Sequence, residues 1–188
     1  MRVFRVEADV NTYQYFMLQD QRLLRSEQLR FDGTVIHEWS PPAVFSYQPQ
    51  LAYGDFWGFQ MWSAALAASP KAIRLLHVLF ARAGQLLDLP YQGEHFGLLN
   101  VTQCVDCLDP EHTQWILGQE TKKPIRIAKY SFVPERLPES SIFKLPQTAR
   151  SEILCHEGRM SNEDEFRACV EAFALHGLHF RQIWTENI

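Results

Sequence analysis

One segment of the sequence carries a complete set of helix signals, and it constrains how the rest of the chain can fold. Ser69 suits the N-cap, Pro70 suits the first helical position, and Gly84 suits the end of a helix. One face of this helix is apolar, with Ile73, Leu76, Leu79, Phe80 and Ala83. Such a face must be buried against other elements, so the helix predicts a layered fold.

The other periodic segments are mostly short and typical of strands. We predict strands over residues 2–7, 13–18, 86–89, 95–102, 113–117, 125–132, 141–145 and 178–184. Residues 30–54 hold Asp-Gly and Pro-Pro turns, which indicate irregular structure with short strands. A second helix is expected from a Ser161 cap to Gly177, with Phe173 and Ala174 in its buried stripe. The predicted fold class is α+β, with a mainly antiparallel sheet and two principal helices.

Composition bounds the class of protein. The chain has 188 residues, 46% of them hydrophobic, with no internal repeat or linker, so we expect one domain over residues 1–188. A net charge of −4 argues against a nucleic-acid binder, and no apolar run is long enough to cross a membrane. The first residues lack a secretory signal, and four cysteines are too few for a disulfide scaffold, so we expect a cytoplasmic protein.

Charge is unevenly distributed along the chain. Residues 151–188 hold 3 basic and 7 acidic side chains, whereas residues 121–150 hold 7 basic and 2 acidic ones. The simpler interpretation is two solvated faces of opposite sign. The alternative is a polarised surface that steers a charged protein partner.

The cysteines suggest a metal site or a nucleophile, but the pattern is incomplete. Cys104 and Cys107 have the two-residue gap of a zinc or redox pair, and Cys155 with His156 would supply two more ligands. A zinc site normally has a second knuckle of similar shape, so we expect partly buried thiols, with no metal and no cofactor. Neither a phosphate-binding loop nor a nucleophile elbow occurs, and the paired carboxylates suit turns and a helix start. We therefore expect no enzyme activity.

Large aromatic residues cluster in the turn-rich part of the chain. Trp39 precedes a Ser-Pro-Pro turn, and Asp55, Trp57 and Trp62 lie in or beside a Gly-Asp-Phe-Trp-Gly-Phe run. Such aromatics either anchor loops over the core or form exposed anchors of a protein interface. Core packing is the first interpretation, and the second stays open.

A series of short motifs resembles a known family along nearly the whole chain. It comprises Asp9-Val10-Asn11-Thr12-Tyr13-Gln14, Trp39 with Pro41 or Pro42, Gly54-Asp55-Phe56, Gly84-Gln85-Leu86-Leu87-Asp88-Leu89, Gly93-Glu94, Leu99-Asn100-Val101-Thr102, Asp106-Cys107-Leu108-Asp109, Tyr130-Ser131-Phe132, Ile142-Phe143-Lys144-Leu145-Pro146, Arg150-Ser151 and Gly177-Leu178-His179-Phe180. In order and spacing the series resembles the bacterial immunity proteins of polymorphic toxin systems, immunity family eleven, also called domain of unknown function 1629.

The resemblance implies a function in bacterial competition. It implies an α+β protein that binds and neutralises a cognate protein toxin, encoded next to it, and it carries over no catalytic residue. The chain departs from the family pattern around Trp57 to Trp62 and in the acidic stretch that opens the last helix, so partner specificity is expected there. With the turn-rich aromatic region and the last helix included, the partner-binding candidates are Trp39, Asp55, Trp57, Trp62, Glu163, Asp164 and Glu171. Two alternatives remain: a small metal- or cysteine-dependent enzyme, and a structural module of a secretion system. The sequence leaves self-association open.

Overall fold

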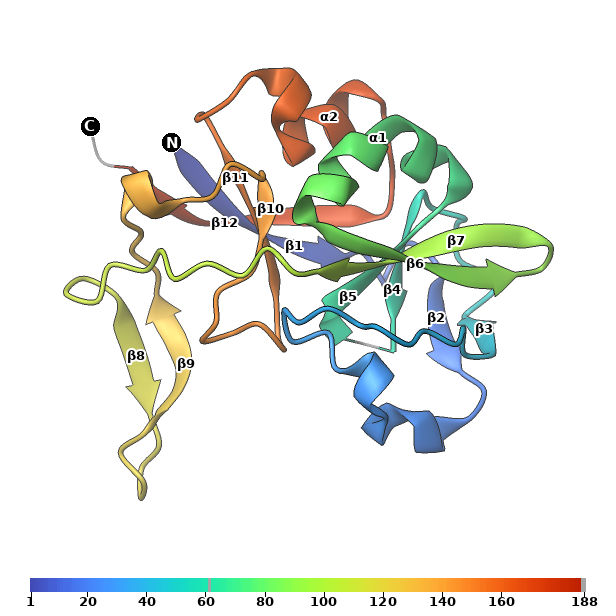
Figure 1. Cartoon of the computed structure of the whole chain (residues 1–188), viewed down its shortest axis with the longest axis horizontal. Helices are drawn as coiled ribbons and strands as arrows, with labels where there is room; N and C mark the ends of the chain where they lie inside the picture. Colours follow the sequence, from blue (N-terminus) through green and yellow to red (C-terminus); the bar gives the residue numbers. More distant parts are fainter. Residues whose placement is uncertain (61, 187–188) are drawn as a thin grey trace.

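The computed structural model describes residues 1–60 and 62–186, and over these residues it contains three sheets and two α-helices (Figure 1). The helices are α1 (Pro70–Ala83) and α2 (Phe166–Ala172). The strands are β1 (Arg2–Ala8), β2 (Tyr15–Leu18), β3 (Val44–Tyr47), β4 (Phe56–Phe59), β5 (Trp62–Ala68), β6 (Gly84–Tyr91), β7 (Glu94–Val101), β8 (Gln114–Leu117), β9 (Pro124–Lys129), β10 (Ile142–Phe143), β11 (Ile153–Glu157) and β12 (Leu178–Thr185). Four short 3-10 helices are η1 (Gln21–Arg25), η2 (Glu27–Leu29), η3 (Pro134–Arg136) and η4 (Asn162–Asp164).

The sheets are almost entirely antiparallel, which confirms the predicted α+β class. A four-stranded sheet has the order β10-β11-β1-β12, and a six-stranded sheet has the order β3-β2-β4-β5-β7-β6. Only β2 and β4 run parallel among the described strand pairs. The third sheet is the β8–β9 hairpin, which projects from the body of the molecule (Figure 1).

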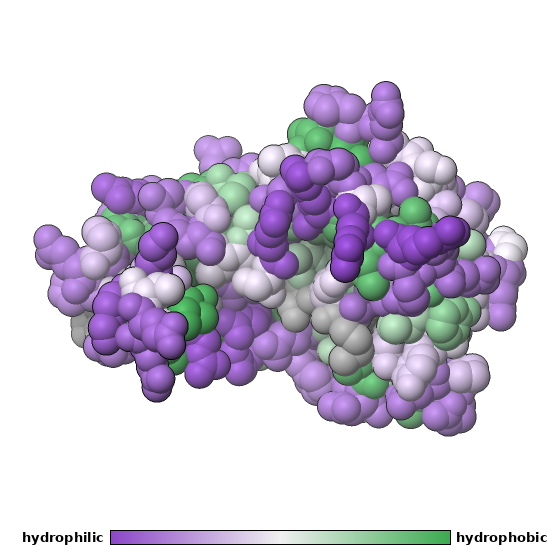
Figure 2. Space-filling model, turned by 90° about the horizontal axis from the view of Figure 1, so that it is seen from below, coloured by the Kyte–Doolittle hydropathy of each residue, from purple (hydrophilic) through white to green (hydrophobic). Residues whose placement is uncertain are grey.

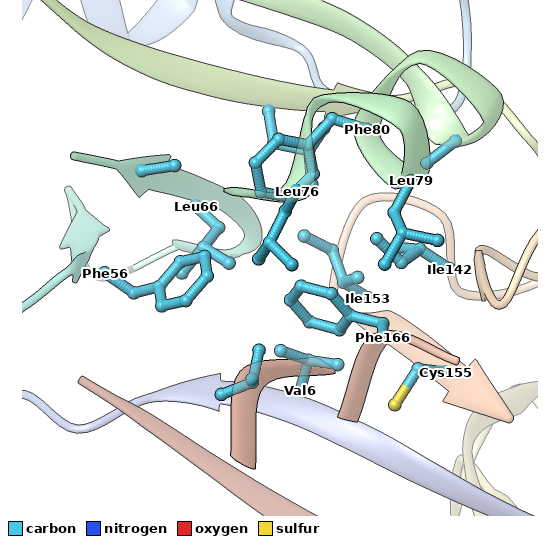
Figure 3. Packing of buried hydrophobic residues seen from close by; sticks show 14 of the residues in the cluster. Val6, Phe56, Leu66, Leu76, Leu79, Phe80, Ile142, Ile153, Cys155 and Phe166 are labelled. Carbon is cyan, nitrogen blue, oxygen red and sulfur yellow. The ribbon is translucent and has the colours of Figure 1, made fainter. Parts of the chain in front are cut away.

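The main core lies where α1 and α2 pack on the two larger sheets. Figure 3 shows Leu76 and Phe80 of α1 close to Leu66 of the six-stranded sheet, with Ile153 of the four-stranded sheet nearby. Ser69 caps α1 as predicted, since its side chain accepts a hydrogen bond from the Ala72 backbone N–H at 3.2 Å. The first helix prediction is therefore confirmed from its cap to its end at Gly84.

The inner strands of both larger sheets are buried on both faces, whereas edge strands such as β6 and β12 keep exposed residues. In β1, Phe4 and Val6 enter the main core, whereas Val3 enters a second cluster with Phe143 and Leu154. A strand buried on both faces loses the polar and apolar alternation that predicts strands from sequence. This explains why β4, β5 and β11 were not among the predicted strands.

The second helix is shorter than predicted. The segment over Asn162–Asp164 is a 3-10 turn, and α2 begins only at Phe166, with Glu165 as its N-cap residue. The helix ends at Ala172, so Phe173 is exposed, and Ala174 takes a left-handed φ of 48°. The expectation that Ser161 caps a long helix with Phe173 in its buried stripe is therefore wrong. Most of the predicted stripe is kept by Phe166, Cys169 and Val170.

Several family-like motifs meet at one junction between the sheets. The backbone N–H of Asp9 donates to the carbonyl of Gly177 at 2.9 Å, and the backbone N–H of Phe56 donates to the carbonyl of His176 at 2.9 Å. Gly177 has a φ of 109°, and a Cβ atom there would lie 2.1 Å from the carbonyl oxygen of Phe56. Only glycine fits this contact, so the start of β12 lies directly against the start of β4.

Candidate functional site

The tryptophans predicted for partner binding mostly serve the core. Trp57 has no exposed surface, and its indole N–H donates to the carbonyl of Gly54 at 2.9 Å. Trp39 and Trp62 are half-buried against the buried cluster that contains Trp57, on the face of the six-stranded sheet away from the main core. The indole N–H of Trp39 donates to the carbonyl of Asp88 at 2.7 Å. These contacts favour core packing, and Trp57 has no surface to offer a partner.

Asp55 is used within the fold. Its side chain is 13% exposed, and its carboxylate accepts the backbone N–H of His176 at 3.0 Å. The same carboxylate pairs with Lys71 at 3.3 Å at the start of α1. Asp55 therefore ties α1 and β4 to the junction around Gly177.

The predicted acidic candidates are largely neutralised by neighbouring residues. Asp164 pairs with Arg82 of α1 at 2.5 Å, and Glu171 pairs with Arg167 at 2.6 Å. The hydrogen bond from Arg82 lowers the pKa of Asp164, with help from Ser161. Glu163 is exposed, and it has no ion pair among the described residues.

The structure does not assemble the cysteine site. Cys155 lies in the main core, whereas Cys107 belongs to the cluster on the other face of the four-stranded sheet. Among residues 1–60 and 62–186, no group of three His, Cys, Asp or Glu side chains is arranged to hold a metal ion. Burial raises the pKa of Cys107 to about 12 and also raises those of Cys104 and Cys155. Since the thiolate is the reactive form, these thiols are not activated nucleophiles.

A charged cluster forms the floor of a surface groove of about 700 Å³. Arg5 of β1 donates to Glu152 at 2.7 Å and to the hydroxyl of Tyr130 at 2.7 Å, and that hydroxyl donates to Glu152 at 2.9 Å. Burial and the charge of Glu152 raise the pKa of Tyr130 to about 12, so the phenol stays protonated at neutral pH. The three groups satisfy one another, and a protonated phenol cannot act as a base.

The feature that the candidate residues did not include is the β8–β9 hairpin beside this groove. Its exposed side chains are apolar at Ile116, Leu117 and Ile125. They are basic at Lys122, Lys123, Arg126 and Lys129. The basic excess of residues 121–150 and the two predicted strands pointed to this segment, but neither signal alone indicated that it would project from the body.

In the part of the chain that the structure covers, no helix combines the length and the apolar character needed to cross a membrane. The search of curated proteins found no match for this chain. The family comparison matches residues 3–185 to the Immunity protein family (Imm11), in agreement with the resemblance carried by the motifs. Because the match covers nearly the whole chain, this protein belongs to the Imm11 immunity protein family.

Proposed function

We propose that this protein neutralises a cognate bacterial effector toxin by binding it. The observation that carries the proposal is the family match over residues 3–185. We further propose that the chain acts as one domain in the cytoplasm of the toxin-producing cell, and that a neighbouring reading frame encodes the toxin. Inhibition then consists of covering the toxin's active site or holding the toxin in an inactive state, without catalysis or a cofactor.

The internal organisation of the protein supports a binding role. An inhibitor of this kind needs a surface that is already ordered, because ordering side chains and loops on binding costs affinity. Three buried clusters give the sheets and α1 a fixed framework. The charged cluster of Arg5, Tyr130 and Glu152 is satisfied internally, which suits a rigid groove better than a reacting site.

Co-expression tests the proposal. The neighbouring reading frame is expressed in a sensitive host with this protein or with an empty vector, and survival is counted. We expect survival only with this protein, together with a complex of the two purified proteins that dissociates slowly. A host that dies equally in both cases, with purified components that do not associate, would contradict the proposal.

The enzyme alternative needs its own test. We expect Cys104→Ser and Cys107→Ser variants to protect the host as well as the wild-type protein, provided that thermal melting shows an intact fold. Loss of protection in a folded variant, or stoichiometric zinc in the purified protein, would favour the enzyme alternative instead.

A further inference from the structure

The base of the β8–β9 hairpin is anchored firmly to the body. Trp115 and Ile127 are direct cross-strand partners, and both pack into the cluster that contains Phe132. Where the two strands join the body, the backbone N–H of Asp109 donates to the carbonyl of Ser131 at 2.9 Å, and Leu108 forms an isolated bridge with Phe132. The body therefore fixes the direction in which the hairpin projects.

Beyond this base, the hairpin exposes apolar side chains that the body does not cover. The exposed fractions are 38% for Ile116, 50% for Leu117 and 67% for Ile125. Ile116 and Ile125 both line the groove beside the hairpin. Two strands alone are marginally stable in water, and exposed aliphatic side chains that lie together mark interaction sites. Figure 2 looks at the molecule from the side of the hairpin tip and shows green apolar atoms among purple ones on the left-hand lobe, where the hairpin lies.

The basic residues around these apolar side chains form no ion pairs with the described part of the protein. Lys122, Lys123, Arg126 and Lys129 are all exposed, and none has an ion-pair partner within residues 1–60 and 62–186. Over residues 114–129 the only acidic residue is Glu120, so the local charge is 4 − 1 = +3 in a protein of net charge −4. Arg126 and Lys129 also line the groove whose floor holds the Arg5–Glu152 pair.

Exposed apolar side chains next to unpaired charged ones, as at Ile116 and Arg126, are typical of a protein interface. Lysines on a sheet edge also discourage aggregation, but that purpose does not explain uncovered isoleucine and leucine on the same two strands. Binding of single-stranded nucleic acid relies on exposed aromatic faces, whereas Trp115, the aromatic residue of these strands, packs into the body. The combination fits an acidic protein surface with an apolar patch.

We infer that the β8–β9 hairpin, together with the adjoining groove, is the surface that grips an acidic face of the toxin. This inference rests on the proposed function and adds the site and the chemistry of the partner. The free basic side chains would steer the encounter, and the aliphatic side chains would slow dissociation. The acidic stretch before α2, which the sequence favoured, is not the contact surface in this account.

A pair of matched double variants tests the inference. The first changes the hairpin by Ile125→Asp with Arg126→Glu. The control changes the outer face of α1 by Leu75→Asp with Arg74→Glu, because Leu75 is also exposed, at 40%. Binding of each purified variant to the nuclease-treated toxin is measured at low and high salt, and thermal melting verifies the fold of both.

We expect the hairpin variant to bind at least about 30-fold more weakly, as after loss of one interface hot spot. Its association rate at low salt should fall about 10-fold, and the control should bind like the wild-type protein. Wild-type affinity in a folded hairpin variant would overturn the inference alone. Binding that nuclease treatment abolishes would overturn it in favour of nucleic acid. A wild-type protein that never binds the toxin would overturn the proposed function, and the inference would fall with it.

Discussion

The acidic C-terminal segment and the basic β8–β9 hairpin carry opposite charge, but they use it differently. Six of the seven acidic side chains in 151–188 have ion-pair or hydrogen-bond partners within the protein. The seventh, that of Glu163, has none among the described residues. The four basic residues of the hairpin have none among the described residues. Charge that the fold neutralises contributes to stability, whereas free charge is available to a partner. Substitutions in the two regions should therefore change different properties.

We expect the greatest loss of stability from a substitution at Glu165, and almost none from one at Glu163, two positions earlier. Glu165 is 1% exposed, and its carboxylate accepts backbone N–H groups from Gly158, Arg159 and Met160 at 2.6, 3.0 and 3.0 Å. We expect Glu165→Ala to lower the free energy of unfolding by about 3 kcal/mol, because these donors lose a charged acceptor. Chemical denaturation measures this value. Glu163→Ala is the matched control and should stay within about 0.5 kcal/mol; equal losses would remove the distinction between held and free charge.

Burial of Lys144 should make the stability of the protein depend on pH. Lys144 is fully buried, donates to the carbonyls of Phe31 and Ala64, and has its pKa lowered by burial to about 8. Between pH 8 and the ordinary lysine pKa of 10.5, the unfolded chain binds this proton and the folded chain does not. The group therefore adds stability as pH rises, by roughly 3 kcal/mol in total.

The pH dependence of Lys144 is measured against a Lys144→Met variant. Unfolding free energies of both proteins between pH 7 and pH 10 should diverge, with the wild-type protein gaining more as pH rises. Parallel curves would mean that Lys144 keeps an ordinary pKa in the fold.

A smaller effect is expected at the exposed ion pair between Asp164 and Arg82. The hydrogen bond from Arg82 lowers the pKa of Asp164 below its ordinary value of 3.8. The pair therefore contributes stability above pH 3.8, and this contribution is lost as pH falls through the lowered pKa of the folded state. The melting temperature of an Asp164→Asn variant should lie slightly below that of the wild-type protein at pH 7, and the difference should vanish in acid. A difference that persists in acid would point to another cause.

The smallest effect on stability is expected in the hairpin. Lys122→Ala with Lys123→Ala should leave the free energy of unfolding within about 0.5 kcal/mol of the wild-type value, because neither side chain has an ion-pair partner among the described residues. A clear loss of stability in denaturation experiments would show that these charges serve the fold, and would weaken their role in binding.

The sequence predicted the elements whose signals are local. The helix from Pro70 to Ala83 follows from its cap, its apolar face and its terminal glycine, and β1 and β9 follow from alternation. By contrast, β4 is buried on both faces, so its composition alone could not distinguish a strand from a loop of core aromatics. Trp57 illustrates the consequence: its burial is decided by the six-stranded sheet, which assembles from strands distant in the chain.

The functional surface was predictable only in part, for a similar reason. The acidic excess of the last segment is visible in the sequence, but its neutralisation depends on Arg5, Arg82 and other residues far along the chain. The basic excess of the hairpin is equally visible. Its exposure depends on the tertiary contacts that anchor only the base of the hairpin, and no local pattern reports them.

Hydrogen exchange of the free protein and of its complex with the toxin shows whether the β8–β9 hairpin or the acidic segment around α2 contacts the toxin. We expect the amides of Gln114–Lys129 to become protected in the complex, whereas those of Phe166–Ala172 exchange at unchanged rates. Protection confined to the segment around α2, with the hairpin unaffected, would contradict this account.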